Sequence, residues 1–463
     1  MEDIFLNYSV FKEFVKNKKV AVAGVGVSNL PLVEFFSRLG AKVVCCDRKT
    51  ADKFDRKTME ILKNKCEEIH LGEDYLEHFS GCDIILRSPG IRFDRPEFVK
   101  AVSEGAVLTG EIELFLALCP AKTIGITGSD GKTTTTTLIY EMLKQSGKKC
   151  FLGGNIGAPL LNRIEDIGRD DVAVIELSSF QLHNMRVSPD VAVITNITPN
   201  HLDYHKDYQE YIDAKKNVYI HGGESSRLVV NHDNELTRNI GAQNTVGKTT
   251  FFSKENIGDD NVYLSKNVIY RGGEPVIKTE DIKIRGIHNV ENYMAAIGAV
   301  GDMVSREDIY NVATNFGGVA HRMELVREKD GVKYYNDSIA STPTRTAAGL
   351  RACDRKVILI AGGYDKHISY EDFGDVIVDC VKYLVVIGQT GGAIKASTER
   401  ALAERGENIP IISCETFEQA INAAHKAASA EDYVILSPAS ASFDMFKNFE
   451  ERGNLFKEIV NRL

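Results

Sequence analysis

Apolar runs that end in glycine, serine or aspartate recur along the chain. Residues 18–47, KKVAVAGVGVSNLPLVEFFSRLGAKVVCCD, contain an apolar run, a glycine turn, a helical segment and a second apolar run that ends at Asp47. This order predicts a strand, a helix and a strand, which together form one βαβ unit. The run CDIILRSPGI, at residues 82–91, predicts a further strand that stops at a Pro-Gly turn.

The pattern restarts at two later points. GEIELFLALCPAKTIGITGSDGKTT begins a new unit, and DVAVIELSSF and DVAVITNITPNHLD predict two further strands that end in polar loops. Near residue 319 another series begins, with VKYYNDSIAST, KVILIAGGYDK, YLVVIGQTGG and DYVILSPASASFD. Alternating strands and helices indicate parallel sheets. We therefore predict an α/β protein of three domains, at residues 1–111, 112–318 and 319–463.

The segment GSDGKTT, at residues 128–134, carries the most specific chemistry. Glycines let backbone amides turn toward phosphate oxygens, Lys132 adds a positive charge, and a threonine hydroxyl can bind Mg²⁺. The usual P-loop has a glycine five residues before its second glycine, where this chain has Ile126. The remaining features favour a nucleoside triphosphate site over a capped helix start.

Two other strand-end loops hold candidate metal ligands. Glu176 in ELSSFQL follows the strand DVAVI, where a carboxylate could reach Mg²⁺ or its waters, although alone it could equally be a surface acid. His201 in NITPNHLDYH could ligate a metal, although a lone loop histidine is more often structural. Lys215 and Lys216 lie in a helical pattern and are typical of a solvated charge pair.

Loops in the first and third segments could bind further anionic or polar groups. GVGVSN, at residues 24–29, lacks the third glycine of a dinucleotide fingerprint, so it is either a tight turn or a helix start that faces a diphosphate. Asp47 and Arg48 lie at the position where an acidic residue often hydrogen-bonds a ribose or a base edge in nucleotide-binding α/β folds. In the third segment Arg322 in AHRME suits recognition of phosphate or carboxylate. Three strand-end loops, NDSIAST, GGYDKH and SPASASFDMFKNFEERG, gather hydroxyls, acids and lysine, which suggests a binding face for a small polar molecule.

Composition narrows the classes of partner. The chain has 463 residues and a net charge of −9, which argues against broad binding to nucleic acid or acidic membranes. Nine scattered cysteines without a CxxC pair indicate reduced thiols in a cytoplasm. We expect neither a signal peptide nor a membrane span, because no apolar run is long enough.

Together these motifs resemble the Mur ligase family of ATP-dependent amide-forming enzymes, over nearly the whole chain. The family uses the shorter loop G-x-x-G-K-T/S, so GSDGKTT is intact for it. AHRME, NDSIAST and LSPASASFDMFKNFEERG are most similar to members that add D-glutamate. The third segment lacks an Asp-Asn-Pro-Arg run, which argues against a member that adds a diamino acid. The resemblance implies a Rossmann-like N-terminal domain, a central P-loop-type ATP-binding domain and a Rossmann-like C-terminal domain.

The resemblance also implies a reaction. ATP phosphorylates the terminal carboxylate of UDP-N-acetylmuramoyl-L-alanine, the amine of D-glutamate attacks the acyl phosphate, and ADP and phosphate leave. Such an enzyme would use ATP and Mg²⁺ in cytoplasmic peptidoglycan precursor synthesis, as a monomer. We further expect the chain to close on ATP, because Arg322 and the loop of the central domain should meet one nucleotide.

The family pattern assigns roles to residues at matching positions. Lys132, Glu176, His201 and Lys215 match the catalytic groups. The ATP site would comprise Gly128, Ser129, Asp130, Gly131, Lys132, Thr133, Thr134, Asn289, Asn292, Arg322 and Asp337. The metal ligands would come from Thr133, Thr134, Glu176, His201 and a carbamylated Lys215, since a carbamate is an anion and an ammonium repels the ion.

The same pattern assigns the substrate contacts. Ser28, Asn29, Asp47, Arg48, Ser88, Pro89 and Gly90 would bind the uridine diphosphate. Asn155, Ser178 and Gln181 would face the muramoyl peptide, and Ser341, Lys366, Ser442, Phe443 and Phe449 would form the amino-acid pocket. Two positions depart from the pattern: Ile339 stands where relatives often carry lysine, and Ser341 where they often carry threonine.

Three other functions remain open from the sequence. Another Mur ligase or a folylpolyglutamate synthase would share the central domain, and the loops around Lys366 and Ser442 would distinguish them by choosing the amine. A nicotinamide-dependent oxidoreductase would leave residues 128–134 without a role. A non-catalytic nucleotide-binding module would tolerate loss of Glu176 and His201.

Overall fold

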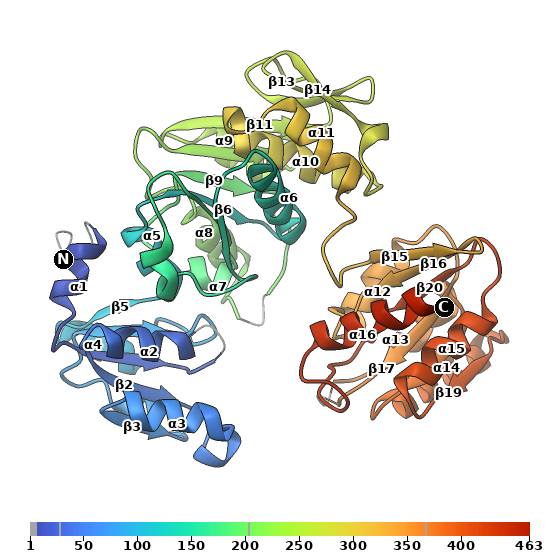
Figure 1. Cartoon of the computed structure of the whole chain (residues 1–463), viewed down its shortest axis with the longest axis horizontal. Helices are drawn as coiled ribbons and strands as arrows, with labels where there is room; N and C mark the ends of the chain where they lie inside the picture. The colour runs from blue at the N-terminus through green and yellow to red at the C-terminus, as the bar shows by residue number, and fades with distance from the viewer. Residues whose placement is uncertain (1–6, 27–28, 202–203, 366–367) are drawn as a thin grey trace. The chain divides into compact units, whose positions relative to one another are not determined.

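The computed structural model describes residues 7–26, 29–201, 204–365 and 368–463. The chain divides into two compact units, Met1–Asn315 and Phe316–Leu463. The first unit contains two β-sheets and the second unit contains one (Figure 1). The α/β class predicted from the sequence is therefore confirmed, while the predicted boundaries at residues 111 and 318 stay predictions.

The N-terminal sheet is parallel, with strand order β3-β2-β1-β4-β5. Strands β1 (Lys19–Ala23) and β2 (Lys42–Asp47) flank α2 (Leu30–Arg38), as the sequence predicted. The strand order reverses between β1 and β4, and ligands of open α/β sheets bind at such a point. The other elements are α1 (Tyr8–Phe14), η2 (Ala51–Lys53), α3 (Arg56–Lys65), β3 (Glu68–Leu71), η3 (Tyr75–Glu77), β4 (Ile84–Arg87), α4 (Pro96–Ser103), β5 (Val107–Thr109) and α5 (Glu111–Leu118).

The central sheet has nine strands in the order β14-β13-β12-β11-β10-β9-β6-β8-β7. Strand β6 (Lys122–Thr127) lies between β8 (Val172–Glu176) and β9 (Val191–Ile194) and is parallel to both. The polar loops predicted to carry chemistry therefore meet at one edge of the sheet. Strands β12 (Val262–Ser265), β13 (Val268–Arg271) and β14 (Glu274–Lys278) form an antiparallel extension, which the sequence reading missed.

Helices α6 (Lys132–Gln145), α10 (Ile287–Val300) and α11 (Arg306–Asn315) lie side by side on the central sheet (Figure 1). Ten residues of α10 are buried, and most of them belong to its apolar C-terminal half. The remaining elements are β7 (Cys150–Gly154), η4 (Leu161–Asp166), α7 (Ser179–Leu182), α8 (Tyr208–Lys216), β10 (Arg227–Asn231), α9 (Glu235–Ala242), β11 (Lys248–Ser253), η5 (Thr279–Asp281) and η6 (Gly301–Met303). A single hydrophobic core runs from α2 through α5 into the central domain, which joins the two domains of the first unit.

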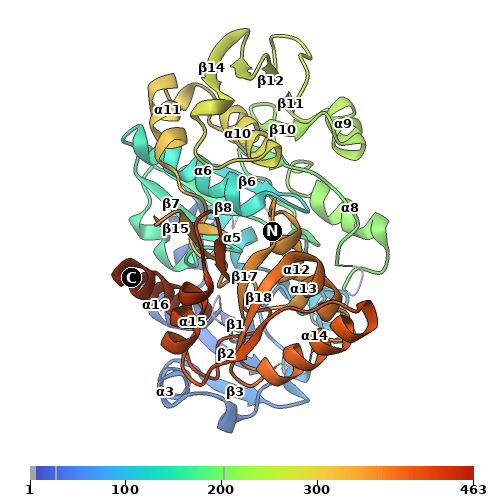
Figure 2. The same cartoon turned by 90° about the vertical axis from the view of Figure 1, so that its right-hand side faces the viewer.

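The second unit has a six-stranded sheet in the order β15-β16-β20-β17-β18-β19, antiparallel only between β15 and β16. One core lies under α12, α13 and α14 and a second under α15 and α16, on opposite faces (Figure 2). The elements are β15 (Glu324–Lys329), β16 (Val332–Asn336), α12 (Pro343–Arg351), β17 (Val357–Gly362), α13 (Phe373–Cys380), β18 (Val381–Ile387), α14 (Gly391–Arg405), β19 (Ile411–Ser413), α15 (Phe417–Ala427), β20 (Tyr433–Leu436) and α16 (Phe449–Arg462). Within the described residues, no helix is both long and apolar enough to cross a membrane.

Candidate active site

The phosphate loop connects β6 to α6 and requires glycine at two positions. Gly128 has a φ of +151°, and a Cβ there would lie 1.9 Å from Thr195 Oγ1. Gly131 has a φ of +77°, and a Cβ there would lie 2.3 Å from Asn292 Oδ1. A side chain at either position would collide with Thr195, just beyond β9, or with Asn292 on α10, so this loop conformation favours glycine at both positions.

The Lys132 ammonium turns back over this loop. Its Nζ donates to the carbonyl oxygens of Gly128 and Ser129, both at 2.8 Å. Helix α6 begins at Lys132, so the positive end of the helix dipole also faces the loop. The loop therefore combines a cation, a helix N-terminus and glycine amides, which suits the phosphates of a nucleotide.

Lys215 on α8 reaches the same carbonyl from a buried position. Only 1% of the residue is exposed, and its Nζ donates to the Gly128 oxygen at 2.8 Å and to Thr127 Oγ1 at 3.3 Å. Burial, followed by the nearby charge of Lys132, holds the pKa of Lys215 well below its usual range. The alternative of a solvated charge pair does not hold for Lys215, because α8 turns this side chain into the site.

Glu176 ends β8 with an unsatisfied carboxylate oxygen. The residue is 1% exposed, and Oε1 accepts from Asn155 Nδ2 at 2.7 Å. Oε2 has no hydrogen-bond partner among the described residues. A buried polar atom without a partner costs about 1–3 kcal/mol. A divalent cation would satisfy it, so the donor set here fits Mg²⁺.

His201 lies in the turn beyond the end of β9 with a φ of +54°. Its ring is 5.0 Å from that of Phe180 and 6.5 Å from that of Tyr211, measured between centroids. The Lys215 ammonium lies 4.7 Å from the centroid of the same Tyr211 ring. Strands β8 and β9 and helix α8 thus bring the predicted metal ligands around one end of β6.

Tyr211 is a residue of this site that the sequence reading missed. Its hydroxyl shares a 2.8 Å hydrogen bond with Ser129 Oγ, which also donates to the Thr198 carbonyl. Burial raises the pKa of Tyr211 to about 12, so the phenol stays protonated. Its position one turn before Lys215 on α8 was the available signal, since residues four apart share a helix face.

Of the two predicted asparagines of α10, Asn292 lies against Gly131 of the phosphate loop, and Asn289 contacts Asn292. Asn292 Oδ1 accepts from Thr135 Oγ1 at 3.2 Å, and its Nδ2 donates to Asn289 Oδ1 at 3.3 Å. Thr133 is buried and Thr134 is half-buried in the first turn of α6. Asp130 is exposed, and its amide donates to Asn196 Oδ1 at 2.9 Å.

The first domain places two predicted diphosphate loops together at the end of β1. A Cβ on Gly24 would lie 2.8 Å from Ser88 Cβ, so the two loops touch. Asp47 accepts from the amides of Val25 at 2.5 Å and Lys49 at 2.8 Å, and this buried carboxylate therefore shapes the first loop. Asn29 Nδ2 donates to the Gly24 carbonyl at 3.0 Å. The predicted contacts Arg48 and Gly90 are exposed, and Ser28 lies outside the described residues.

Ser178 and Gln181 form a capping box at the start of α7. The Ser178 amide donates to Gln181 Oε1 at 2.9 Å, and the Gln181 amide donates to Ser178 Oγ at 3.3 Å. These side chains cap the N-terminus of α7 whether or not they also bind the muramoyl peptide. Asn155, beside Glu176, is the third residue predicted for that contact.

In the second unit, Asp337 follows β16 and is buried. It accepts from Ser437 Oγ at 2.6 Å and from the Met323 amide at 3.2 Å. Burial raises the pKa of Asp337 to about 6. Arg322, its predicted companion at ATP, is exposed.

The predicted amino-acid pocket is organised by a residue that the sequence reading missed. Arg452 on α16 is 2% exposed, and its guanidinium donates to Ser338 Oγ at 3.0 Å and to the carbonyls of Ser440 and Ala441. It therefore fixes two predicted pocket loops against each other. The pocket residues on these loops and on α16 are Ser341, Ser442, Phe443 and Phe449, and Lys366 lies outside the described residues.

Comparison with known proteins identifies the family. Models of the MurD-like N-terminal domain, the Mur ligase middle domain and the Mur ligase glutamate ligase domain match residues 18–110, 126–300 and 321–440. A UDP-N-acetylmuramoylalanine–D-glutamate ligase of Acetivibrio thermocellus is 52% identical over 461 residues, which cover 98% of each chain. This chain belongs to the Mur ligase family. The resemblance inferred from the motifs is confirmed, and the oxidoreductase alternative is wrong.

Other Mur ligases are similar over the same length. The UDP-N-acetylmuramoylalanine–D-glutamate ligase of Clostridium perfringens is 49% identical and covers 99% of both chains. Two solved structures share the fold at 18% identity. UDP-N-acetylmuramate–alanine ligase of Thermotoga maritima has a TM-score of 0.56, with 96% of this chain and 99% of that chain covered. The MurF ligase of the same organism, in complex with ADP, has a TM-score of 0.52 and full coverage of both chains.

Proposed function

We propose that this chain is an ATP-dependent ligase that joins D-glutamate to UDP-N-acetylmuramoyl-L-alanine. The observation that carries the proposal is the cluster at the end of β6, where Lys132 and Lys215 meet at one glycine loop and the unsatisfied Glu176 ends the neighbouring strand β8. The relatives about 50% identical over the whole chain are named for this amino acid. Their names support the choice of D-glutamate over another amine.

The reaction proceeds through two displacements. An oxygen of the substrate carboxylate attacks the γ-phosphorus of ATP, and ADP leaves. The amine of D-glutamate then attacks the acyl carbon, loses a proton, and expels inorganic phosphate. Such phosphoryl transfer depends mainly on positioning and on neutralising charge.

The residues of the chain divide this work. Lys132 and the amides of residues 128–134 hold the phosphates of ATP. Glu176, His201 and the carbamate of Lys215 would hold Mg²⁺, which neutralises phosphate charge when bound. The loops at residues 24–29 and 88–90 bind the uridine diphosphate. The hydroxyls of the second unit, with Lys366, bind the carboxylates of D-glutamate.

Further properties follow from this activity. All nine cysteines are free thiols in the structure, which suits a reducing compartment. We infer a cytoplasmic enzyme, where ATP and nucleotide-linked sugars are made, and we propose that it acts as a monomer.

The test is phosphate release by the purified chain with ATP, Mg²⁺ and UDP-N-acetylmuramoyl-L-alanine. D-glutamate, L-glutamate or no amino acid is added, and the product is weighed by mass spectrometry. We expect release that depends on D-glutamate, with a product heavier by one glutamyl unit. Release without amino-acid preference, or with another amine, would refute the assignment of the amino-acid pocket.

A further inference from the structure

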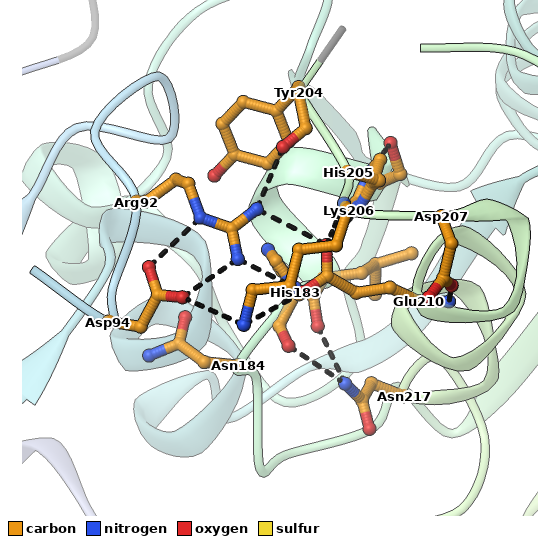
Figure 3. Close-up of polar contacts among 12 residues, drawn as sticks. Arg92, Asp94, His183, Asn184, Tyr204, His205, Lys206, Asp207, Glu210 and Asn217 are labelled. Atoms are coloured by element: carbon orange, nitrogen blue, oxygen red, sulfur yellow. Dashed lines mark hydrogen bonds and ion pairs between the residues drawn. The ribbon is translucent and has the colours of Figure 1, made fainter. Parts of the chain in front are cut away.

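Arg92 lies in the loop between β4 and α4, and all five of its N–H groups donate hydrogen bonds (Figure 3). Two bonds go to the oxygens of Asp94 in the same loop, at 2.9 and 2.8 Å. Two go to the oxygens of Glu210 on α8, at 3.2 and 3.0 Å. The fifth goes to the Tyr204 carbonyl at 2.7 Å. A planar guanidinium with every donor used fixes all its partners at once.

Tyr204 extends this network in two directions. Its hydroxyl donates to the Pro89 carbonyl at 3.1 Å, inside the loop predicted to bind the uridine diphosphate. Its amide donates to the His201 carbonyl at 3.1 Å, and its ring centroid lies 4.2 Å from that of Phe180. One residue thus contacts the substrate loop of the first domain and the turn that carries a predicted metal ligand.

Glu210 is the acceptor at the centre of the network and not part of a metal centre. His183 and His205 place a ring nitrogen 3.3 and 3.5 Å from its two oxygens, a spacing that could suggest a metal site. Both oxygens, however, already accept from Arg92, and a divalent cation at this carboxylate would repel the guanidinium. Hydrogen bonding by Arg92 is also the largest cause that lowers the pKa of Glu210 to about 2.

The Arg92–Glu210 pair is shielded enough to matter energetically. The Arg92 side chain is 23% exposed and that of Glu210 is 19% exposed. Salt screens a partly buried, bidentate pair less than an exposed one. A second contact between the same domains, from Arg87 Nη2 to Asn184 Oδ1 at 2.8 Å, does not involve Arg92. Removing Arg92 should therefore loosen the His201 turn without separating the domains.

We propose that Arg92 is a positioning residue that couples the loop at residues 88–90 to the turn at His201. Binding of the uridine diphosphate fixes the loop at residues 88–90. Arg92 and Tyr204 transmit that position to His201, which is two hydrogen bonds away from Arg92. This inference rests on the function proposed above, from which it takes the roles of Pro89 and His201.

The first test compares Arg92→Gln and Arg92→Lys with the control Arg95→Gln in the full chain. Arg95 lies in the same loop and pairs only with Glu97 among the described residues, at 2.9 Å. We expect Arg92→Gln to lower kcat on the order of tenfold, since small misplacements of reacting groups have effects of that size or larger. The Mg²⁺ concentration for half-maximal rate should rise severalfold, and the KM for D-glutamate should not change. Arg92→Lys keeps the positive charge but lacks the planar fork of donors. Its kcat should therefore lie between those of Arg92→Gln and the wild-type chain.

The second test measures the coupling directly, with Mn²⁺ binding followed by electron spin resonance. In the wild-type chain, UDP-N-acetylmuramoyl-L-alanine should tighten Mn²⁺ binding about fivefold or more, a usual size for coupled sites. This factor should approach one in Arg92→Gln. If the glutamine variant does not fold, the factor in Arg92→Lys should lie clearly below the wild-type factor. An unchanged factor, even with lower activity, would overturn the proposal. If the wild-type chain did not release phosphate in a D-glutamate-dependent manner, that result would instead refute the proposed function.

Discussion

The ammonium groups of Lys132 and Lys215 donate to the same carbonyl oxygen, that of Gly128, each at 2.8 Å. Two cations at one acceptor repel each other, and burial adds to the penalty at Lys215. At the same edge of the sheet, Glu176 Oε2 is buried without a partner among the described residues. Excess positive charge and an unsatisfied carboxylate within one cluster indicate groups that are completed by ligands or by modification.

Carbamylation of Lys215, which the family resemblance implies, would remove this conflict. A neutral amine reacts with CO₂ and releases a proton, so a lowered pKa at Lys215 favours the carbamate at neutral pH. We expect Lys215→Ala to lower kcat on the order of 100-fold, a typical effect of losing a group that stabilises transition-state charge. Activity of the wild type should fall in CO₂-free buffer, more at pH 6 than at pH 8, and return with bicarbonate.

Lys216 provides the matched control for this prediction. Its ammonium pairs with Asp213 at 2.9 Å on the outer face of α8. Lys216→Ala should retain wild-type kcat and the same response to CO₂. If Lys215→Ala lost activity while CO₂ had no influence on the wild type, the lysine would act as a cation and the carbamate role would be abandoned.

At the level of elements, the sequence predicted motifs formed by neighbouring residues and missed contacts between residues far apart in the chain. The βαβ unit and the loop at residues 128–134 follow from patterns that span a few residues each. Tyr211 meets Ser129 across 82 positions of the chain, and Arg452 meets Ser338 across 114. Such contacts are set by strand order and helix packing, which periodicity does not encode. The burial of Lys215 likewise depends on how α8 packs, since its residue type alone suggested an exposed side chain.

The turn between β6 and α6 offers a test of why this element needs glycine. Gly128→Ala must place a Cβ 1.9 Å from Thr195 Oγ1 and must also hold a φ of +151°. We expect a loss of about 1–3 kcal/mol from overpacking, in addition to about 1–2 kcal/mol from the unfavourable φ. The KM for ATP should rise at least tenfold, because the loop amides move.

Gly147→Ala separates the two contributions. Gly147 has a φ of +80°, but a Cβ added there would meet no atom of the described residues within 4 Å. This variant should lose only the conformational part of the stability, measured by urea unfolding, and keep the wild-type KM for ATP. Equal effects of the two substitutions on stability and on KM would show that packing around Gly128 is not what fixes the loop.

At the level of the whole molecule, the chain consists of two units with separate cores. The cores around α2 and α4 belong to Met1–Asn315, and those around α13 and α15 belong to Phe316–Leu463. The proposed uridine diphosphate and muramoyl contacts all fall in the first unit, whereas the proposed D-glutamate contacts fall in the second. Stability in each unit should therefore respond to different ligands.

Hydrogen exchange can resolve this response along the chain. UDP-N-acetylmuramoyl-L-alanine alone, at 100 times its Kd, should stabilise the first unit by about 2.7 kcal/mol through mass action. Peptides from the strands of both sheets of that unit should then exchange up to about 100-fold more slowly. Peptides from β17, β18 and β20 should exchange at their unliganded rates, because the ligand has no assigned contact there. Equal protection in both units would mean that they unfold as one cooperative body, and protection confined to the second unit would contradict the assignment of the substrate loops at residues 24–29 and 88–90.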